Sequence, residues 1–333
     1  MIKDKYTNFL VRTKENKLFK ITYDESMNIY FEDILNNKII NKEILYKNAF
    51  KYFYIFEDSN RDINFIYQDI FGNININILT EGSIKHKDFF SCDKNFIIHL
   101  DFKGIYLSNA PVYFYKNDID NKIYLYNNKE TDNKIHLYNN KNIIYNNKDD
   151  IYTNYKVFIN ENFISLIIYS ISVNIFKLLL KTYNKKNKAW SNEVSIFITD
   201  KPYIDMSFCI SNNKLHSLII INEGKESVLI YKYNNLDKDI GVQREVILCE
   251  YEDISSCLLI ESNNIIWLFW ISRNKMYYCK STDFGENFSE VLVYLTNIDD
   301  SIRKINFIDS GINKETYISE KGENIILILD KLY

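Results

Sequence analysis

The side chains of this 333-residue chain that could do chemistry are mainly carboxylates, which lie in polar segments between apolar runs. The candidates for ligand binding are seven charged residues: Asp24, Asp69, Asp118, Glu223, Arg273, Arg303 and Glu320. A surface rich in carboxylates attracts cations and basic partners and repels anionic sugars and nucleic acids. If several of them converge they could hold Ca²⁺, the one cofactor that the sequence suggests. Polar turns collect Asp and Glu in any fold, so the acids alone do not define a site.

Other catalytic or metal-binding patterns do not occur in the sequence. His86, His99, His136 and His216 are scattered, with no His at i+4 and no Cys at i+2 or i+3, so no zinc site is predicted. Residues 235–239 resemble the start of a calcium loop but lack its Gly at the sixth position and its Glu at the twelfth. No phosphate-binding glycine loop, nucleophile elbow or zinc-protease motif is present. We therefore assign no catalytic residue and no metal ligand.

Composition and charge argue against several classes of protein. The net charge is −3 and charged residues make up 26% of the chain, which argues against a nucleic-acid binder with a basic face. The N-terminus has no apolar segment typical of a secretory signal. The most apolar stretch, 163–180, is interrupted by Asn174 and Lys177, so no membrane span is predicted. The five cysteines lack CxxC spacing, as expected of reduced thiols in the cytoplasm, although a secreted or surface form is not excluded.

A repeat of short apolar runs is the strongest signal in the sequence. Runs rich in Ile, Tyr, Phe and Leu alternate with clusters of Asn, Asp, Gly or Lys, which is typical of strands joined by tight turns. Seven runs have the character of innermost strands, and they begin near Asn8, Tyr52, Phe96, Val157, Met206, Ser256 and Ile305. The steps between them are 44, 44, 61, 49, 50 and 49 residues. Three further strands follow most of these runs, as in the blades of a β-propeller.

The sequence therefore predicts an all-β protein, a single β-propeller domain of seven four-stranded antiparallel blades. The expected blades are 8–46, 50–90, 95–145, 156–199, 203–249, 253–296 and 304–333. The last of these offers only three strands, and residues 2–6 are expected to add the missing outer strand and close the ring. Such closure removes an exposed sheet edge. A ring of six blades remains the alternative.

One motif indicates a particular kind of propeller. Residues 281–288 read S-T-D-F-G-E-N-F, the pattern S-x-D-x-G-x-x-F, between two predicted strands. Asp283 can accept backbone N–H bonds across such a turn, Gly285 can supply a positive φ, and an aromatic at Phe288 can anchor the turn. The motif resembles the Asp box of the sialidase-like propellers, whose last aromatic is usually Trp. The resemblance implies that Ser281, Asp283, Gly285 and Phe288 are structural, and a degraded copy runs from Thr182 to Ser191.

The catalytic residues of that family are not matched. A sialidase holds its substrate carboxylate with three arginines, whereas this chain has only five arginines in all. Only Arg273 and Arg303 fall on the face expected to bear the pocket, and no Arg-Ile-Pro motif occurs. Sialidase activity is therefore not expected.

The expected binding face is the one formed by the turns between second and third strands and by the connections between blades. Those connections add Asp93, Asp149, Asp150, Asp200, Glu250, Asp253, Asp299 and Asp300 to the acids named above. We expect a non-enzymatic binding or scaffolding module whose acidic face engages a protein or a cationic ligand. The alternative is a carbohydrate-active protein, either a glycoside hydrolase with paired carboxylates or a lectin. No nucleic-acid partner is expected, and the oligomeric state is left open with a monomer assumed.

Overall fold

The chain is all-β in the part that the computed structural model describes, and its elements are short strands without helices. The structure describes residues 8–57, 62–80, 83–90, 100–107, 110–117, 122–127, 142–146, 151–172, 174–236, 242–251, 253–309 and 312–330. The strands form six hydrogen-bonded sheets, each built from strands that are consecutive in the sequence except for the sheet that joins the two ends.

Five of the sheets are antiparallel meanders. The second contains β5 (Ala49–Glu57), β6 (Ile63–Asp69), β7 (Ile74–Thr80) and β8 (Ser83–Phe90). The third contains β9 (Leu100–Leu107), β10 (Ala110–Asn117), β11 (Lys122–Asn127) and β12 (Asn142–Asn146). The fourth contains β13 (Ile151–Ile159), β14 (Phe163–Ser172), β15 (Ile175–Asn184), β16 (Ala189–Trp190) and β17 (Val194–Thr199). The fifth contains β18 (Tyr203–Ser211), β19 (Lys214–Asn222), β20 (Ser227–Asn235) and β21 (Val242–Tyr251), and the sixth contains β22 (Ile254–Ser262), β23 (Ile265–Ser272), β24 (Lys275–Ser281) and β25 (Leu292–Thr296).

The first sheet joins the two ends of the described chain, and we call it the closed sheet. It combines β1 (Asn8–Arg12), β2 (Leu18–Tyr23), β3 (Ile29–Leu35) and β4 (Lys38–Tyr46) with β26 (Ile302–Asp309), β27 (Ile312–Lys321) and β28 (Asn324–Leu327). β1 pairs parallel with β26, with Phe9 opposite Asn306. β28 meets β4 where Asn324 lies opposite Lys38, so the seven strands close on themselves.

This closure differs from the prediction of a separate last blade completed by residues 2–6. Those residues lie outside the described part of the chain. The three strands β26–β28 instead share one sheet with β1–β4, so the seven predicted repeats correspond to six sheets. The physical reason lies in backbone pairing: β26 finds its hydrogen-bonding partner in β1, and the outer edge of β28 is met by β4.

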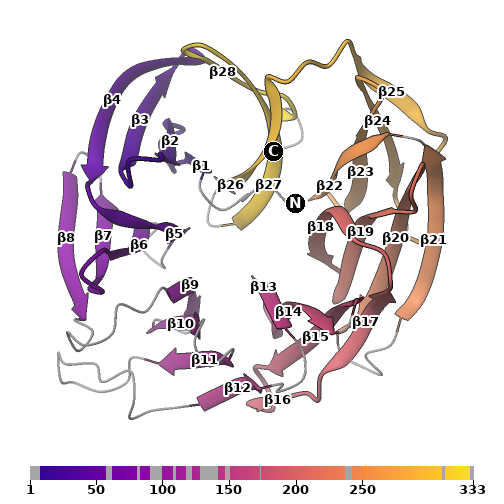
Figure 1. Cartoon of the computed structure of the whole chain (residues 1–333), viewed down its shortest axis with the longest axis horizontal. Coiled ribbons are helices and arrows are strands. Elements are labelled where there is room, and N and C mark those ends of the chain that lie inside the picture. Colours follow the sequence, from indigo (N-terminus) through magenta and orange to yellow (C-terminus); the bar gives the residue numbers. More distant parts are fainter. Residues whose placement is uncertain are drawn as a thin grey trace.

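The sheets stand around a common centre, as Figure 1 shows. The first strand of each of the five meanders lies toward the centre and the later strands lie progressively outward. The apolar core is divided between neighbouring sheets. Phe9 of the closed sheet packs on Phe53 of the second sheet, with ring centroids 5.4 Å apart, and Tyr231 and Trp270 belong to one cluster between the fifth and sixth sheets. Many small cores, rather than one large one, therefore stabilise a chain of this length.

Asparagine shapes the tight turns between these strands. Of the fifteen non-glycine residues with positive φ in the described ranges, eleven are Asn, including the pairs at 36–37, 212–213 and 263–264. Asn adopts the left-handed region at lower cost than most residues, and two such residues in sequence suit the two-residue hairpin turn. A sequence with only eight glycines can therefore form this many hairpins.

Candidate functional site at the ring centre

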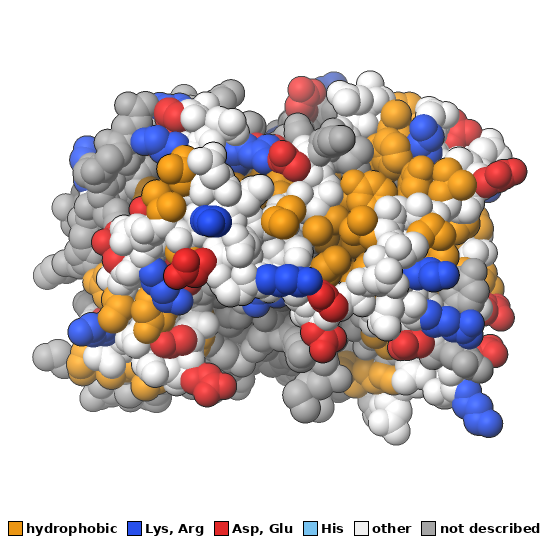
Figure 2. Space-filling view, turned by 90° about the horizontal axis from the view of Figure 1, so that it is seen from above, with side chains coloured by type: hydrophobic (Ala, Val, Ile, Leu, Met, Phe, Trp, Pro, Cys, Tyr) orange, Lys and Arg blue, Asp and Glu red, His pale blue; other side chains and the backbone are white. Residues whose placement is uncertain are grey.

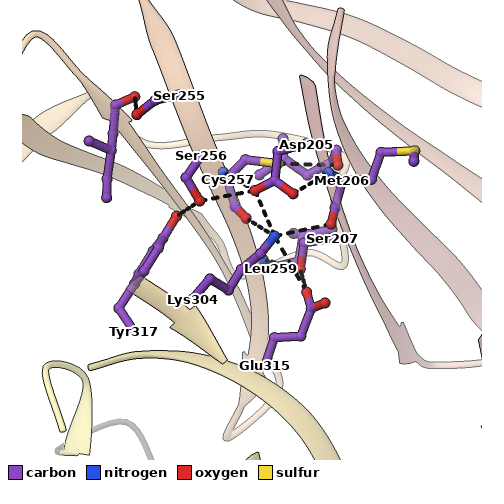
Figure 3. Close-up of polar contacts among 12 residues, drawn as sticks. Asp205, Met206, Ser207, Ser255, Ser256, Cys257, Leu259, Lys304, Glu315 and Tyr317 are labelled. Carbon is purple, nitrogen blue, oxygen red and sulfur yellow. Dashed lines mark hydrogen bonds and ion pairs between the residues drawn. The ribbon is translucent and has the colours of Figure 1, made fainter. Parts of the chain in front are cut away.

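Charged side chains from several sheets meet at the centre of the ring, and Figure 3 shows Lys304, Asp205 and Glu315 among them. The Lys304 ammonium on β26 lies 2.8 Å from a carboxylate oxygen of Asp205 on β18 and 3.7 Å from Oε2 of Glu315 on β27. Oε1 of Glu315 lies 2.6 Å from the ammonium of Lys156 on β13. Asp205, Lys304, Glu315 and Lys156 thus form a row of alternating charges, which we call the central ion row.

Further hydrogen bonds satisfy the groups of this row. The Lys304 ammonium donates to the carbonyl oxygens of Cys257, at 2.6 Å, and Met206, at 3.1 Å. Asp205 accepts from the Cys257 N–H at 3.0 Å and from the Ser256 hydroxyl at 2.9 Å. The carboxylate of Asp205 and the ammonium of Lys304 are therefore each held by backbone as well as by charge.

The row is buried and its charges are balanced. The Asp205 and Lys304 side chains are each only 4% exposed. Burial lowers the pKa of the Lys156 ammonium from its ordinary value, and the neighbouring Glu315 carboxylate opposes this change. Desolvating such ions is costly and is offset only by good geometry and additional hydrogen bonds, both of which are present here. Because each carboxylate is paired with an ammonium, the row ties β13, β18, β26 and β27 together. Its four charged groups are engaged with one another and are not arranged as a general acid and a general base.

A second set of ion pairs lies within the closed sheet and contains two of the predicted ligand residues. The Lys20 ammonium lies 2.6 Å from Oε1 of Glu320 and 3.2 Å from Oε2 of Glu32. Arg303 pairs with the other oxygen of Glu320, and Lys42 lies 2.7 Å from Glu32. β2 and β27 are not neighbours in the closed sheet, so the buried Lys20 reaches across its interior. Arg303 and Glu320 thus meet, and Glu320 is also paired with Lys20, which links the last repeat to the first.

Two more predicted ligand residues are tied into their own turns. Oδ1 of Asp24 accepts the N–H groups of Ser26 and Asn28, and its other oxygen accepts the Tyr30 hydroxyl. Asp69 accepts the equivalent N–H groups two and four residues further on. Burial raises the pKa of Asp24, but the hydrogen bonds from Asn28, Tyr30 and Ser26 outweigh it and hold the pKa below its ordinary value. These carboxylates close turns rather than reach for a ligand.

The remaining candidates lie apart from one another. Glu223 and Arg273 are exposed in the β19–β20 and β23–β24 turns, in different sheets. Asp118 lies outside the described residues, as do Asp93, Asp149 and Asp150. Within the described ranges no group of three or more His, Cys, Asp or Glu side chains is arranged to hold a metal ion. The seven predicted residues therefore do not form one site.

The 281–288 turn connects the third and fourth strands of the sixth sheet. The Ser281 hydroxyl donates to Oδ1 of Asp283 at 2.7 Å and accepts the Gly285 N–H at 2.8 Å. Asp283 also accepts the N–H of Asn287 at 2.9 Å, and these bonds lower its pKa to about 2. Gly285 has a φ of +89°. The polar residues of the motif are thus engaged with one another.

The same turn also contacts the fifth sheet. The Phe288 ring packs edge-on against Tyr231, with centroids 4.8 Å apart. Glu286 accepts the Tyr233 hydroxyl at 2.7 Å and lies 2.9 Å from the Lys214 ammonium. The turn therefore joins two neighbouring sheets at the outer part of the ring.

The degraded copy in the fourth sheet closes in the same way. The N–H of Ser191 donates to the Thr182 carbonyl at 2.7 Å, and the Thr182 N–H donates to the Ser191 hydroxyl at 3.0 Å. Ser289 and Lys280 make the same two bonds in the sixth sheet, at 2.9 and 3.1 Å. Both pairs span nine residues, so the two turns share one closing geometry.

A buried histidine beside this region gives a pH-dependent prediction. His216 Nδ1 lies 2.6 Å from the Tyr231 hydroxyl, and burial lowers the pKa of His216 from 6.5 to about 4. The unfolded chain then binds more protons than the folded one between these values, so stability falls as the pH drops from 6.5 to 4. We expect this one group to account for a loss on the order of 2–3 kcal/mol in that window. Urea unfolding of wild type and His216→Gln at pH 7, 5.5 and 4 measures it, and parallel pH curves for the two proteins would contradict it.

The charged residues that the structure brings together were not singled out by sequence reasoning. Lys156, Asp205 and Lys304 each stand one residue before a predicted innermost strand, and Glu315 lies within the last predicted blade. For Lys156 and Asp205 the signal is a charge between apolar or aromatic neighbours, as in Tyr-Ile-Asp-Met at 203–206. A charge in such a place needs a partner from another strand, because an unpaired buried charge is too costly.

Comparison with known proteins supports the fold only. No protein-family model matches the sequence, and no curated protein matches it. Among solved structures, a prolyl endopeptidase is similar, with 11% sequence identity and a TM-score of 0.52. The match covers 95% of this chain but only 47% of the endopeptidase, so this chain spans about half of its length. A mutant of AofleA from Arthrobotrys oligospora is similar at 8% identity over 94% of this chain and 89% of that chain, with a TM-score of 0.47. An Aleuria aurantia lectin AAL mutant in complex with Fucα1-6GlcNAc is similar at 9% identity over 84% and 90%, with a TM-score of 0.43.

Proposed function

We propose that the chain is a β-propeller of seven repeats, the last fused to the first, and that it acts as a non-enzymatic binding module. Its ligand is a basic protein segment, held on the loop face. We define this face by the turns between second and third strands (24–28, 69–73, 223–226, 273–274 and 322–323) and by the described connections between sheets. No helix in the described ranges is long and apolar enough to cross a membrane.

The main support for this proposal is that the loop face has more exposed carboxylates than exposed basic side chains. Its exposed acids are Glu25, Asp200, Glu223, Glu226, Asp253, Asp300 and Glu323. Its exposed basic side chains are Lys47, Lys201, Lys225 and Arg273, and Lys321 is paired with Asp299 at 2.7 Å. An acidic surface of this kind raises the local concentration of a cationic partner and speeds its association at low salt.

The pattern of pKa values favours binding over hydrolysis. A glycoside hydrolase needs one carboxylic acid whose pKa is raised, so that it can donate a proton. The described carboxyl groups with a resolved shift, Asp24, Glu32, Asp283, Glu286 and Asp299, all have lowered pKa values. The central Asp205 and Glu315 are each paired with a lysine. The described carboxyl groups therefore do not support paired carboxylates of the hydrolytic type.

A labelled nonalysine peptide tests the proposal. We expect it to bind at low ionic strength and to be released in 0.5 M NaCl, as screening of exposed charges requires. Glu223→Gln/Glu226→Gln should weaken binding roughly threefold to tenfold, since exposed pairs contribute about 0.2–1 kcal/mol each. Glu161→Gln/Glu193→Gln removes two exposed glutamates from the opposite end of the strands and serves as the matched control. Fluorescence anisotropy measures all three proteins, and no binding, or equal losses in both variants, would overturn the proposal.

A carbohydrate ligand is the second candidate, and one side chain favours it. Phe71 stands at the tip of the Asp69 turn on the loop face and is 70% exposed. An exposed aromatic ring offers a flat apolar surface to a partner. A glycan array on the wild type, with signals that Phe71→Ala removes and Leu35→Ala on the opposite face retains, would favour this candidate over the basic segment.

A further inference from the structure

The outer edge of the sixth sheet is apolar over four consecutive residues. Val291, Leu292, Val293 and Tyr294 are all exposed, with Leu292 and Val293 near one half. Successive residues of a strand point to opposite faces, so both faces of this segment are partly accessible. The Tyr294 ring packs edge-on against Phe269 and Tyr278 and is the least exposed of the four. Figure 2 shows a broad hydrophobic area on the right half of the rim, the side on which β25 lies in Figure 1. We call residues 291–294 the apolar edge.

Three other outer strands whose side chains the structure describes, β21, β4 and β17, do not share this character. β21 carries Arg244, Glu245 and Glu250, and β4 carries Lys38, Lys42 and Glu43 and meets β28. β17 has no charge, but it buries Ile196 and Phe197 and exposes mainly Ile198. Charges on an edge strand prevent pairing with other chains, and β25 lacks them over its whole length.

The backbone of the apolar edge is free to pair. Among the described strands, β25 stands last in its sheet and pairs only with β24, from Tyr278 opposite Leu292 to Lys275 opposite Thr296. The register shifts after Val293, so Tyr294 is an extra residue that bends the strand. The Tyr294 hydroxyl donates to the Ile328 carbonyl at 3.3 Å, which ties the edge to the segment after β28.

We propose that the apolar edge binds a second copy of this chain, with the two β25 strands antiparallel about a two-fold axis near Val293. Charges at the two ends of the edge argue for this occupant. Exposed Glu290 precedes the edge, and exposed Lys275 lies beside its far end, where it pairs with Thr296 across the β24–β25 ladder. In a two-fold arrangement, the Glu290 side of each copy faces the Lys275 side of the other. The edge is thus complementary to itself in both charge and apolar surface, as an isologous contact requires.

This dimer does not depend on the ligand of the loop face, because the apolar edge belongs to an outer strand rather than to the second-to-third-strand turns. It leaves the loop face of each copy accessible. The assembly would therefore present two identical binding faces to one partner or surface.

Sedimentation velocity from 1 to 100 µM tests the proposal. Wild type should approach twice the 39.8 kDa monomer mass as its concentration rises. Val293→Asp should raise the dimer dissociation constant about tenfold or more by placing a charge in the contact. Ile247→Asp changes an exposed apolar residue of β21 in the same way and should leave the constant unchanged. A wild type that stays monomeric, or a dimer that Val293→Asp does not weaken, would overturn the proposal.

A charge exchange tests the geometry. Glu290→Lys and Lys275→Glu should each weaken the dimer several-fold, and the double variant should recover most of the loss. Both residues are exposed, so folding should not change. Additive losses in the double variant would contradict the antiparallel two-fold arrangement.

Discussion

Replacing Lys304 with methionine is expected to lower the free energy of unfolding by about 3–5 kcal/mol, as when one partner of a buried ion pair is removed. The variant leaves the Asp205 carboxylate buried without its ammonium, and the carbonyls of Met206 and Cys257 lose a donor. Glu315 keeps Lys156 as a partner, so the loss falls mainly on Asp205. Urea unfolding followed by tryptophan fluorescence measures the change.

The exposed pair of Lys321 and Asp299 supplies the control for this experiment. Both side chains are more than half exposed, and the Lys321→Met variant should cost less than about 1 kcal/mol. Lys304→Met combined with Asp205→Asn should recover part of the loss, because it removes the unpaired charge. A cost for Lys304→Met as small as that of Lys321→Met would show that the central ion row does not stabilise the ring.

Replacing Gly285 with alanine is expected to cost about 3 kcal/mol. A Cβ at this position would lie 1.8 Å from the Tyr231 hydroxyl oxygen and 2.8 Å from a carbon of its ring. Tyr231 is fully buried, is hydrogen-bonded to His216 and packs on Phe288, so it has little freedom to move away. The overpacking contributes about 1–3 kcal/mol, and the positive φ adds about 1–2 kcal/mol.

Gly224 separates the two contributions. It has nearly the same conformation, with φ of +92°, but nothing lies within 4 Å of the point that a Cβ would occupy. Gly224→Ala should therefore cost only the conformational part, about 1–2 kcal/mol. Thermal and urea unfolding of both variants give the difference. Equal costs at the two glycines would show that the contact between the 281–288 turn and the fifth sheet is loose.

Local features of this fold follow from the sequence. The apolar runs beginning near Met206, Ser256 and Ile305 coincide with β18, β22 and β26, because β-branched and aromatic residues suit strands and Asn suits the turns between them. The likeness between 182–191 and 280–289 also has a structural counterpart in identical closing bonds. These features depend on residues that are close in the sequence.

Features that depend on distant residues are not predictable in the same way. The pairing of β1 with β26 and of β28 with β4 joins the two ends of the chain, and hydrophobic periodicity carries no information on which edges meet. The candidate site differs from its prediction for another, local reason. Asp24 and Asp69 count as ligand candidates by residue type, although each stands four residues before an Asn, the same spacing as Asp283 and Asn287. That spacing indicates a turn closed by its own carboxylate.

The closed sheet has a consequence for how the chain reaches its native state. Phe9 cannot pair with Asn306 until the roughly 300 residues between them have been synthesised, so β1 must wait for β26. Contacts of such long sequence separation carry a large loop-closure entropy and slow folding. The meanders between them need only neighbouring strands and can form while the ribosome is still translating. Ring closure is then the final event, and a truncation that removes β26 should leave an open array of sheets with its first edge exposed, prone to aggregate rather than to unfold cooperatively.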